Sequence, residues 1–327
     1  MKKILTIFLA VCLAATAVSA LTACEGENEN KRLKIVATIF PEYDWVVNVL
    51  GDGKDDYKLT LLLDSGADLH SYQPTVADMA TIAVCDLFIY VGGESDGWVD
   101  GAMRNATNKN MKTINLLEVL GDNAKEEEHV EGMEEHEHEH EDEHDEEETE
   151  YDEHVWLSLK NAQLFITEIE KVLSSLDAER AEKFKANAAS YNAKLAALDE
   201  EYVAATNNAT NKTLLFADRF PFRYLADDYG LSYYAAFSGC SAETEASFDT
   251  IIFLAGKVDE LGLNYIFTTE SSDGKIARTV KENTANKNQT ILKLDSLQSA
   301  TKRLYDDGKN YLSVMRDNLT VLATALA

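Results

Sequence analysis

Hydrophobic and polar residues alternate along the chain in a pattern that predicts strands and helices in turn. Short apolar runs predict buried strands, and segments with apolar residues three and four apart predict helices. The predicted strands are Leu33–Ile39, Tyr57–Leu63, Leu87–Val91, Met111–Leu117, Thr213–Ala217, Leu231–Phe237, Tyr265–Thr269 and Thr290–Leu294. The predicted helices are Tyr43–Leu50, Thr75–Val84, Ser158–Ser175, Arg223–Tyr229, Phe248–Leu261, Lys275–Thr284 and Tyr311–Leu326. This alternation predicts parallel sheets with right-handed crossovers.

The longest predicted helix lies between these two halves, at residues 177–206. No Gly or Pro interrupts it, and its apolar positions are Ala181, Phe184, Ala188, Tyr191, Leu195, Leu198 and Tyr202. At ~1.5 Å per residue such a helix spans ~45 Å, enough to cross a domain. The predicted fold class is α/β: a lobe at 32–176, this linker helix, and a lobe at 207–327, each with a parallel sheet. Ligands of such sheets bind at the carboxyl ends of the strands, which predicts a cleft site between the lobes.

The N-terminus has the pattern of a secretory signal, predicted at residues 1–23. Lys2 and Lys3 precede an uncharged apolar run, which is too short for a comfortable membrane span. The run ends in Leu-Thr-Ala-Cys24, which resembles the bacterial lipobox, so we expect Cys24 to carry a lipid and residues 24–31 to form a polar tether. The alternative is a plain cleaved signal. We therefore expect a lipoprotein outside the cytoplasmic membrane, anchored to it.

Charge is concentrated in one insert. The chain has a net charge of −28, which argues against a nucleic-acid partner. Sixteen acids and five His, with no Lys or Arg, lie between Glu126 and Glu150, so the rest of the chain carries −12. Residues 123–150 lack the apolar residues needed to offset the entropy of ordering and are predicted to be disordered. The alternatives for this insert are a solvated acidic linker or weak metal capture by its histidines: His129, His136, His138, His140 and His144.

Two histidines lie outside the insert, and both are at predicted junctions before helices. His70 follows the second strand, and His154 precedes the helix at 158–175. A single such His is more often structural, but the pair, beside a His-rich insert in a two-lobed exported chain, indicates a metal site.

Several segments resemble a known family. LDSGADLHSYQPT (63–75) resembles the segment PGxDPHxYEPT, and DEHVWLSL (152–159) the segment DPHxWLDP, of the zinc/manganese solute-binding lipoproteins of ABC transporters, cluster A-I. GLNYIFTTESS (262–272), LKLDSL (292–297) and YLSVMRDNL (311–319) are similar to later segments of that family, in family order.

This resemblance implies the ligands of a metal ion. His70 and His154 would bind through ring nitrogens, and Asp295 through its carboxylate. The family's remaining ligand, His or Glu, falls on Arg219, which cannot ligate a metal. We expect Asp218 to take its place, or Arg219 to pair with a carboxylate beside the site.

Outer or structural roles are expected of the two family acids Glu245 and Glu270. The resemblance also implies a function: binding zinc, with manganese or iron as alternatives, and delivering it to an ABC transporter permease. Two imidazoles and two carboxylates admit all three ions, and the His-rich insert favours zinc. An adhesin-like surface lipoprotein is an alternative of another class. His-Glu-x-x-His occurs only inside the low-complexity acidic insert, at residues 136–140 and 140–144, and the chain has no nucleophile elbow or P-loop, so we expect a non-enzyme, and a monomer.

Overall fold

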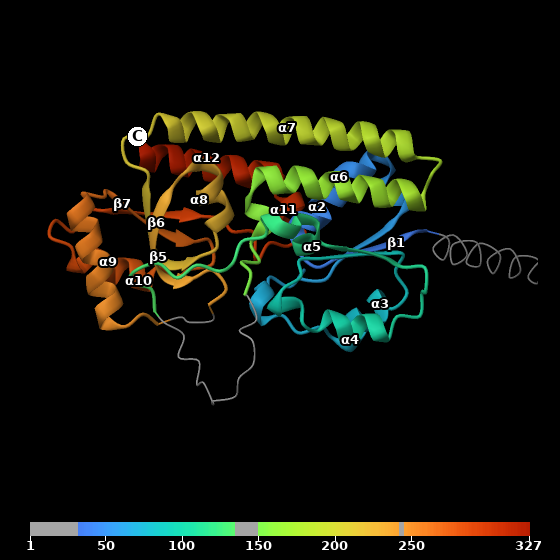
Figure 1. Ribbon diagram of the computed structural model, residues 1–327, viewed down its shortest axis with the longest axis horizontal. Helices are drawn as coiled ribbons and strands as arrows, with labels where there is room; N and C mark the ends of the chain where they lie inside the picture. The colour runs from blue at the N-terminus through green and yellow to red at the C-terminus, as the bar shows by residue number, and fades with distance from the viewer. Residues whose placement is uncertain (1–31, 135–149, 242–244) are drawn as a thin grey trace, which may run out of the picture.

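The computed structural model describes residues 32–134, 150–241 and 245–327, and it holds two parallel sheets with helices packed around them (Figure 1). The first sheet has the order β2-β1-β3-β4, and the second repeats it as β6-β5-β7-β8. All strand pairs within both sheets are parallel. The strands are β1 (Lys34–Ala37), β2 (Lys58–Leu61), β3 (Leu87–Tyr90), β4 (Lys112–Asn115), β5 (Thr213–Phe220), β6 (Ser232–Ser238), β7 (Tyr265–Thr269) and β8 (Thr290–Leu294). The predicted architecture of two parallel-sheet α/β lobes is confirmed.

The helices of the described residues follow the predicted pattern, with three short additions. They are α2 (Phe40–Leu50), α3 (Val76–Ile82), α4 (Val99–Arg104), α5 (Leu116–Leu120), α6 (Leu159–Leu176), α7 (Ala181–Asn207), α8 (Arg223–Tyr229), α9 (Phe248–Leu261), α10 (Lys275–Asn283), α11 (Arg303–Asp306) and α12 (Tyr311–Leu326). The sequence pattern missed α4, α5 and α11 because each has too few residues to show a helical period.

Helix α7 runs along both lobes (Figure 1). It packs against α2 and α6 beside the first sheet, and against α8 and α12 beside the second. Its buried residues repeat three and four apart: Phe184, Ala188, Tyr191, Leu195, Leu198, Tyr202 and Thr206. All but Thr206 are among the predicted positions, whereas the predicted Ala181 is only partly buried. The helix starts at Ala181, not at the expected Asp177, because Asp177 closes α6 through its backbone N–H to Leu173 and accepts the hydroxyl of Tyr57.

Part of the acidic insert is packed, which corrects the expectation of disorder for residues 123–134. Met133 is buried, and the N–H of Glu134 donates to the carbonyl of Ala236 at 3.0 Å. Glu126 forms an isolated antiparallel bridge with Tyr151. This end of the insert is ordered because it has apolar residues that can be buried, and because its backbone groups bond to the second lobe. Its central positions 135–149, with His136, His138, His140 and His144, lie outside the described residues.

The predicted signal at 1–23 and tether at 24–31, with Cys24, also lie outside the described residues. In the ranges that the structure does describe, no helix combines the length and the apolar composition needed to cross a bilayer.

A buried carboxyl caps the start of α2. Oε2 of Glu42 accepts from Thr38 N–H (2.8 Å), the Thr38 hydroxyl (3.0 Å) and Ile39 N–H (3.3 Å). Burial, followed by the charge of Asp96, raises the pKa of Glu42 to about 8. The folded protein therefore holds a proton on Glu42 at neutral pH that the unfolded chain releases near its ordinary value of about 4.3.

This raised pKa predicts a pH-dependent stability. The contribution is full below about pH 4.5 and is lost as pH rises through 8, at about 1.4 kcal/mol per pH unit between these values. Chemical denaturation of the metal-free protein from pH 5 to 8 measures this. The free energy of unfolding should fall less steeply with pH in Glu42→Gln than in the wild type, because Gln keeps an accepting oxygen but does not titrate. Parallel pH profiles of the two proteins would contradict the assignment.

Candidate metal centre

His70 lies in the loop after β2, at the carboxyl end of the first sheet. The loop forms a 3₁₀ turn, η2 (Leu69–Ser71), which Asp68 caps by accepting the backbone N–H of His70 at 3.0 Å. Leu69 is buried in the core of the lobe. A capped turn with one apolar anchor therefore fixes the direction of the imidazole, whose side chain is 9% exposed.

His154 is fully buried just before a second 3₁₀ turn, η5 (Val155–Leu157). All three residues of η5 are buried, and the indole N–H of Trp156 donates to the carbonyl of Ser296 in the second lobe at 2.8 Å. The hydroxyl of Tyr311, on α12, donates to the carbonyl of Trp156 at 2.6 Å. His154 is thus held where the two lobes meet.

The Nδ1 atoms of both imidazoles face acceptors. His154 Nδ1 lies 3.0 Å from Oδ1 of Asp152, which also accepts the backbone N–H of His154. His70 Nδ1 lies 2.8 Å from the hydroxyl of Ser95 and 3.4 Å from Oε2 of Glu153. A carboxylate accepts only, so Nδ1 carries the proton in each neutral ring and Nε2 keeps its lone pair.

Glu153 is itself buried beside this pair. Burial acts to raise its pKa, but the hydrogen bond and charge of His70 and the bonds from Ser95 outweigh burial, and the pKa of Glu153 is lowered. A charged carboxylate therefore stands behind His70, as Asp152 stands behind His154.

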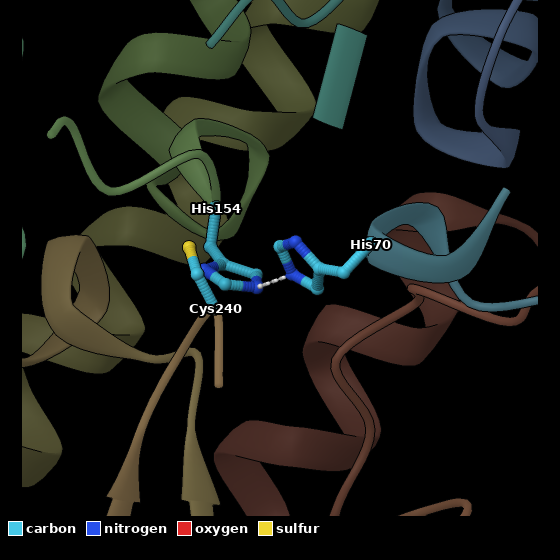
Figure 2. Close-up of side chains that lie close together, drawn as sticks. All are labelled: His70, His154 and Cys240. Carbon is cyan, nitrogen blue, oxygen red and sulfur yellow. Dashed lines mark hydrogen bonds between the residues drawn. The ribbon is translucent and has the colours of Figure 1, made fainter. Parts of the chain in front are cut away.

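The two Nε2 atoms point toward one another, 3.1 Å apart (Figure 2). The side-chain amide nitrogen of Gln298, in the loop after β8, lies 2.9 Å from Nε2 of His70 and 2.6 Å from Nε2 of His154. An amide NH₂ carries two hydrogens, so it donates to both lone pairs at once. The two imidazoles thus converge on a point at which a cation could bind both.

Cys240 is the third residue at this point. Among the described residues, His70, His154 and Cys240 form the group of His, Cys and acidic residues whose ligand atoms lie within 4.8 Å of one another. Figure 2 shows the sulfur beside the ring of His154, on the side away from His70. Burial, followed by the charges of Asp152, Glu127 and Glu153, raises the pKa of the Cys240 thiol.

The structure does not bring the other two predicted ligands into this group. The sequence predicts that Asp218 and Arg219 follow a strand that ends at Ala217. They lie instead inside β5, which has a register shift between Phe216 and Arg219. Oδ2 of Asp218 accepts both the N–H and the hydroxyl of Thr269 at 2.9 Å. Arg219 instead pairs with Asp68 of the first lobe at 2.7 Å.

Asp295 turns toward its own loop. Its Oδ1 accepts the N–H of Leu297 at 2.9 Å, and burial raises its pKa. Glu270 accepts the N–H and the hydroxyl of Ser296, and burial, followed by the charge of Asp295, raises the pKa of Glu270 to about 7. These contacts order the loop that carries Gln298. Glu245 is an exposed residue 3.8 Å from the amine of Lys275.

A cleft of about 570 Å³ leads to His70. The pair of Asp68 and Arg219 lies in its wall, together with Asp218, Thr269 and Lys275. Burial acts to raise the pKa of Asp68, but the charge and hydrogen bond of Arg219 outweigh burial, and that pKa is lowered. This ion pair joins the two lobes across the cleft.

Sequence reasoning missed Cys240 and Gln298. Both follow the carboxyl ends of strands, β6 and β8, as His70 follows β2. That position was the available signal, since ligands of parallel sheets bind there.

Known proteins are similar to this chain over most of its length. The family described as zinc-uptake complex component A, periplasmic, matches residues 35–325. The chain is 31% identical to the zinc-binding lipoprotein AdcA of Streptococcus pneumoniae, over 98% of this chain and 60% of the relative. It is 29% identical to the high-affinity zinc uptake system protein ZnuA of Bacillus subtilis, over 97% and 96% of the two chains. The chain thus spans little more than half the length of the AdcA relatives.

A solved structure has a similar fold. The crystal structure of the Zn(II)-bound ZnuA-like domain of Streptococcus pneumoniae AdcA superposes with a TM-score of 0.70 and 29% identity, covering 90% of this chain and 99% of that one.

The position of Gln298 predicts that its amide competes with a metal ion. Gln298→Ala should raise the affinity for a divalent cation by about fivefold, because the ion no longer has to displace a donor worth roughly 1 kcal/mol. Calorimetric titration checks this, with Gln289→Ala as the control, because Gln289 is also buried in the second lobe but bonds Thr284. A lower affinity in Gln298→Ala would contradict it and would make the amide oxygen a ligand.

Proposed function

We propose, from the premise that this chain belongs to the zinc-uptake complex component A family, that it binds one zinc ion between its lobes and delivers it to an ABC importer. His70 and His154 are the two ligands from the first lobe. The second lobe completes the coordination. The protein acts by binding and release, with no catalytic step.

The facing pair of Nε2 atoms is the observation that carries this proposal. Nδ1 of His154 is bonded to the carboxylate of Asp152, and Nδ1 of His70 lies 2.8 Å from the Ser95 hydroxyl and 3.4 Å from the carboxylate of Glu153. The two rings therefore present their Nε2 lone pairs to one point. Such carboxylate–histidine pairs orient the ring and raise its basicity, as they do in metal sites. Asp152 and Glu153 also place two carboxylates behind the rings, which favours a dication there.

Zinc is favoured over manganese on chemical grounds. Imidazole suits zinc, whereas manganese prefers a site dominated by oxygen ligands, and zinc binds more tightly than manganese to a given nitrogen and oxygen set. In this structure the carboxylates of Asp218 and Asp295 are bonded to Thr269 and Leu297, outside the group around the imidazoles. Asp218 and Asp295 therefore remain predicted ligands, and β5 and the loop after β8 would have to move to bring their carboxylates to the imidazoles.

Access to the site runs through the cleft, and the long helix limits how far the lobes separate. Because α7 packs on both lobes, we propose a small tilt or loop movement on metal binding, not a wide closure. The pair of Asp68 and Arg219 is the contact that such a movement breaks first, since it joins the lobes at the cleft wall.

The cellular setting follows from the sequence. We propose that residues 1–23 are removed, that Cys24 carries the lipid anchor, and that the chain works as a monomer outside the cytoplasmic membrane beside its permease. The histidines at 129, 136, 138, 140 and 144 supply weak, multiple capture of metal ions near the tight site.

Removing the two imidazoles should abolish tight binding. His70→Ala combined with His154→Ala leaves the purified protein without its one tight zinc equivalent, measured by calorimetry and elemental analysis. The matched control changes His136, His138, His140 and His144 to Gln and keeps the tight equivalent, losing only weaker ones. If the double Ala variant retains one tight equivalent, the proposed site is wrong.

A further inference from the structure

We propose that the thiolate of Cys240 is the ligand that the second lobe gives to the metal, and that it makes the site prefer zinc over manganese. This inference rests on the proposed function, because it assumes that His70 and His154 hold the ion. It names a ligand that the resemblance does not supply.

Cys240 lies close to both imidazoles. The sulfur of Cys240 and the ring nitrogens of His70 and His154 lie within 4.8 Å of one another, and no other such trio of His, Cys or acidic residues occurs among the described residues. Ligand atoms of a tetrahedral zinc, with bonds of about 2.0–2.3 Å, are roughly 3.5 Å apart. The two Nε2 atoms, 3.1 Å apart, are already near this spacing, so it is the sulfur that has to approach them, by side-chain rotation.

The loop after β6, which carries Cys240, packs tightly against His154. Gly239 lies against the ring of His154, and a Cβ there would be 3.0 Å from its Cε1 and Nδ1 and 2.9 Å from the carbonyl of Phe220. Only glycine lets the loop approach this closely. The N–H of Cys240 donates to Oε1 of Glu127 at 2.9 Å, so the packed edge of the insert holds the residue in place.

In the described part of the second lobe, no other His, Cys, Asp or Glu joins this group. The resemblance aligns Arg219 with the family's nitrogen or carboxylate ligand, and its guanidinium is held by Asp68 and by the carbonyl of Ser241 at 3.2 Å. The carboxylates of Asp218 and Asp295 lie outside the group. Cys240 forms no disulfide, so its sulfur is available.

The consequence is selectivity. A thiolate is a soft ligand that suits zinc and disfavours manganese, which prefers oxygen. The Cys240 thiol loses its proton to solvent when the dication binds. One thiolate and two neutral imidazoles then leave the bound dication with one net positive charge. The carboxylate of Asp152, bonded to Nδ1 of His154, and that of Glu153, 3.4 Å from Nδ1 of His70, offset it. The site would thus replace a carboxylate ligand by sulfur and gain discrimination between the two ions.

Cobalt(II) tests the ligand directly, without any variant. The purified protein loaded with one equivalent of Co²⁺ should show a thiolate-to-cobalt charge-transfer band in the near ultraviolet. Cys240→Ser should lose the band, whereas Cys85→Ala, a change at the other described cysteine, should keep it. A wild-type cobalt spectrum without the band overturns the inference even if Cys240→Ser fails to fold.

Competition between metals tests the selectivity. In Cys240→Ser the affinity for Zn²⁺ should fall at least tenfold, and the affinity for Mn²⁺ by less than threefold. Unchanged zinc affinity in this variant, with tight binding that still requires His70, overturns the thiolate ligand and leaves the proposed function standing. If the wild-type protein binds no tight equivalent of Zn²⁺, both the thiolate ligand and the proposed function are wrong.

Discussion

Two imidazole nitrogens facing each other at 3.1 Å are the constraint on which the rest of this site depends. Nitrogen lone pairs at that distance repel unless a donor or a cation lies between them. In the structure the amide of Gln298 supplies the donor, and it comes from the second lobe. The same electrostatic requirement is met by a dication. A site that is stable with an internal donor and with an ion can exchange one for the other without leaving buried lone pairs unpaired, which would cost about 1–3 kcal/mol each.

The fold keeps this pair in place through contacts that cross the lobe boundary. Trp156 bonds the loop of Ser296, Tyr311 bonds the backbone at Trp156, and α7 packs on helices of both lobes. The cleft beside His70 is one entrance to the site, and there Asp68 and Arg219 form an ion pair between the lobes. Asp68 also caps the turn that carries His70. Opening the cleft and moving a ligand are therefore linked through one carboxylate.

The sequence predicts the sheets, most helices and the first two imidazoles, and for different reasons. The strands at 265–269 and 290–294 and the helix at 248–261 have the predicted bounds, because local apolar patterns determine them. His70 and His154 lie together because both flank elements of the same lobe. The second-lobe groups could not be predicted in this way. Whether Asp295, Gln298 or Cys240 reaches the imidazoles depends on the register shift in β5, the glycine at 239 and the packing of residues 123–134, none of which has a periodic signal.

Anomalous diffraction at the zinc absorption edge, from crystals of the zinc-loaded protein, tests the central claim most directly. The account predicts one dominant peak within coordination distance, about 2.0–2.1 Å, of Nε2 of both His70 and His154, with the Gln298 amide displaced. A dominant peak elsewhere, with the two imidazoles still bridged by Gln298, would contradict it.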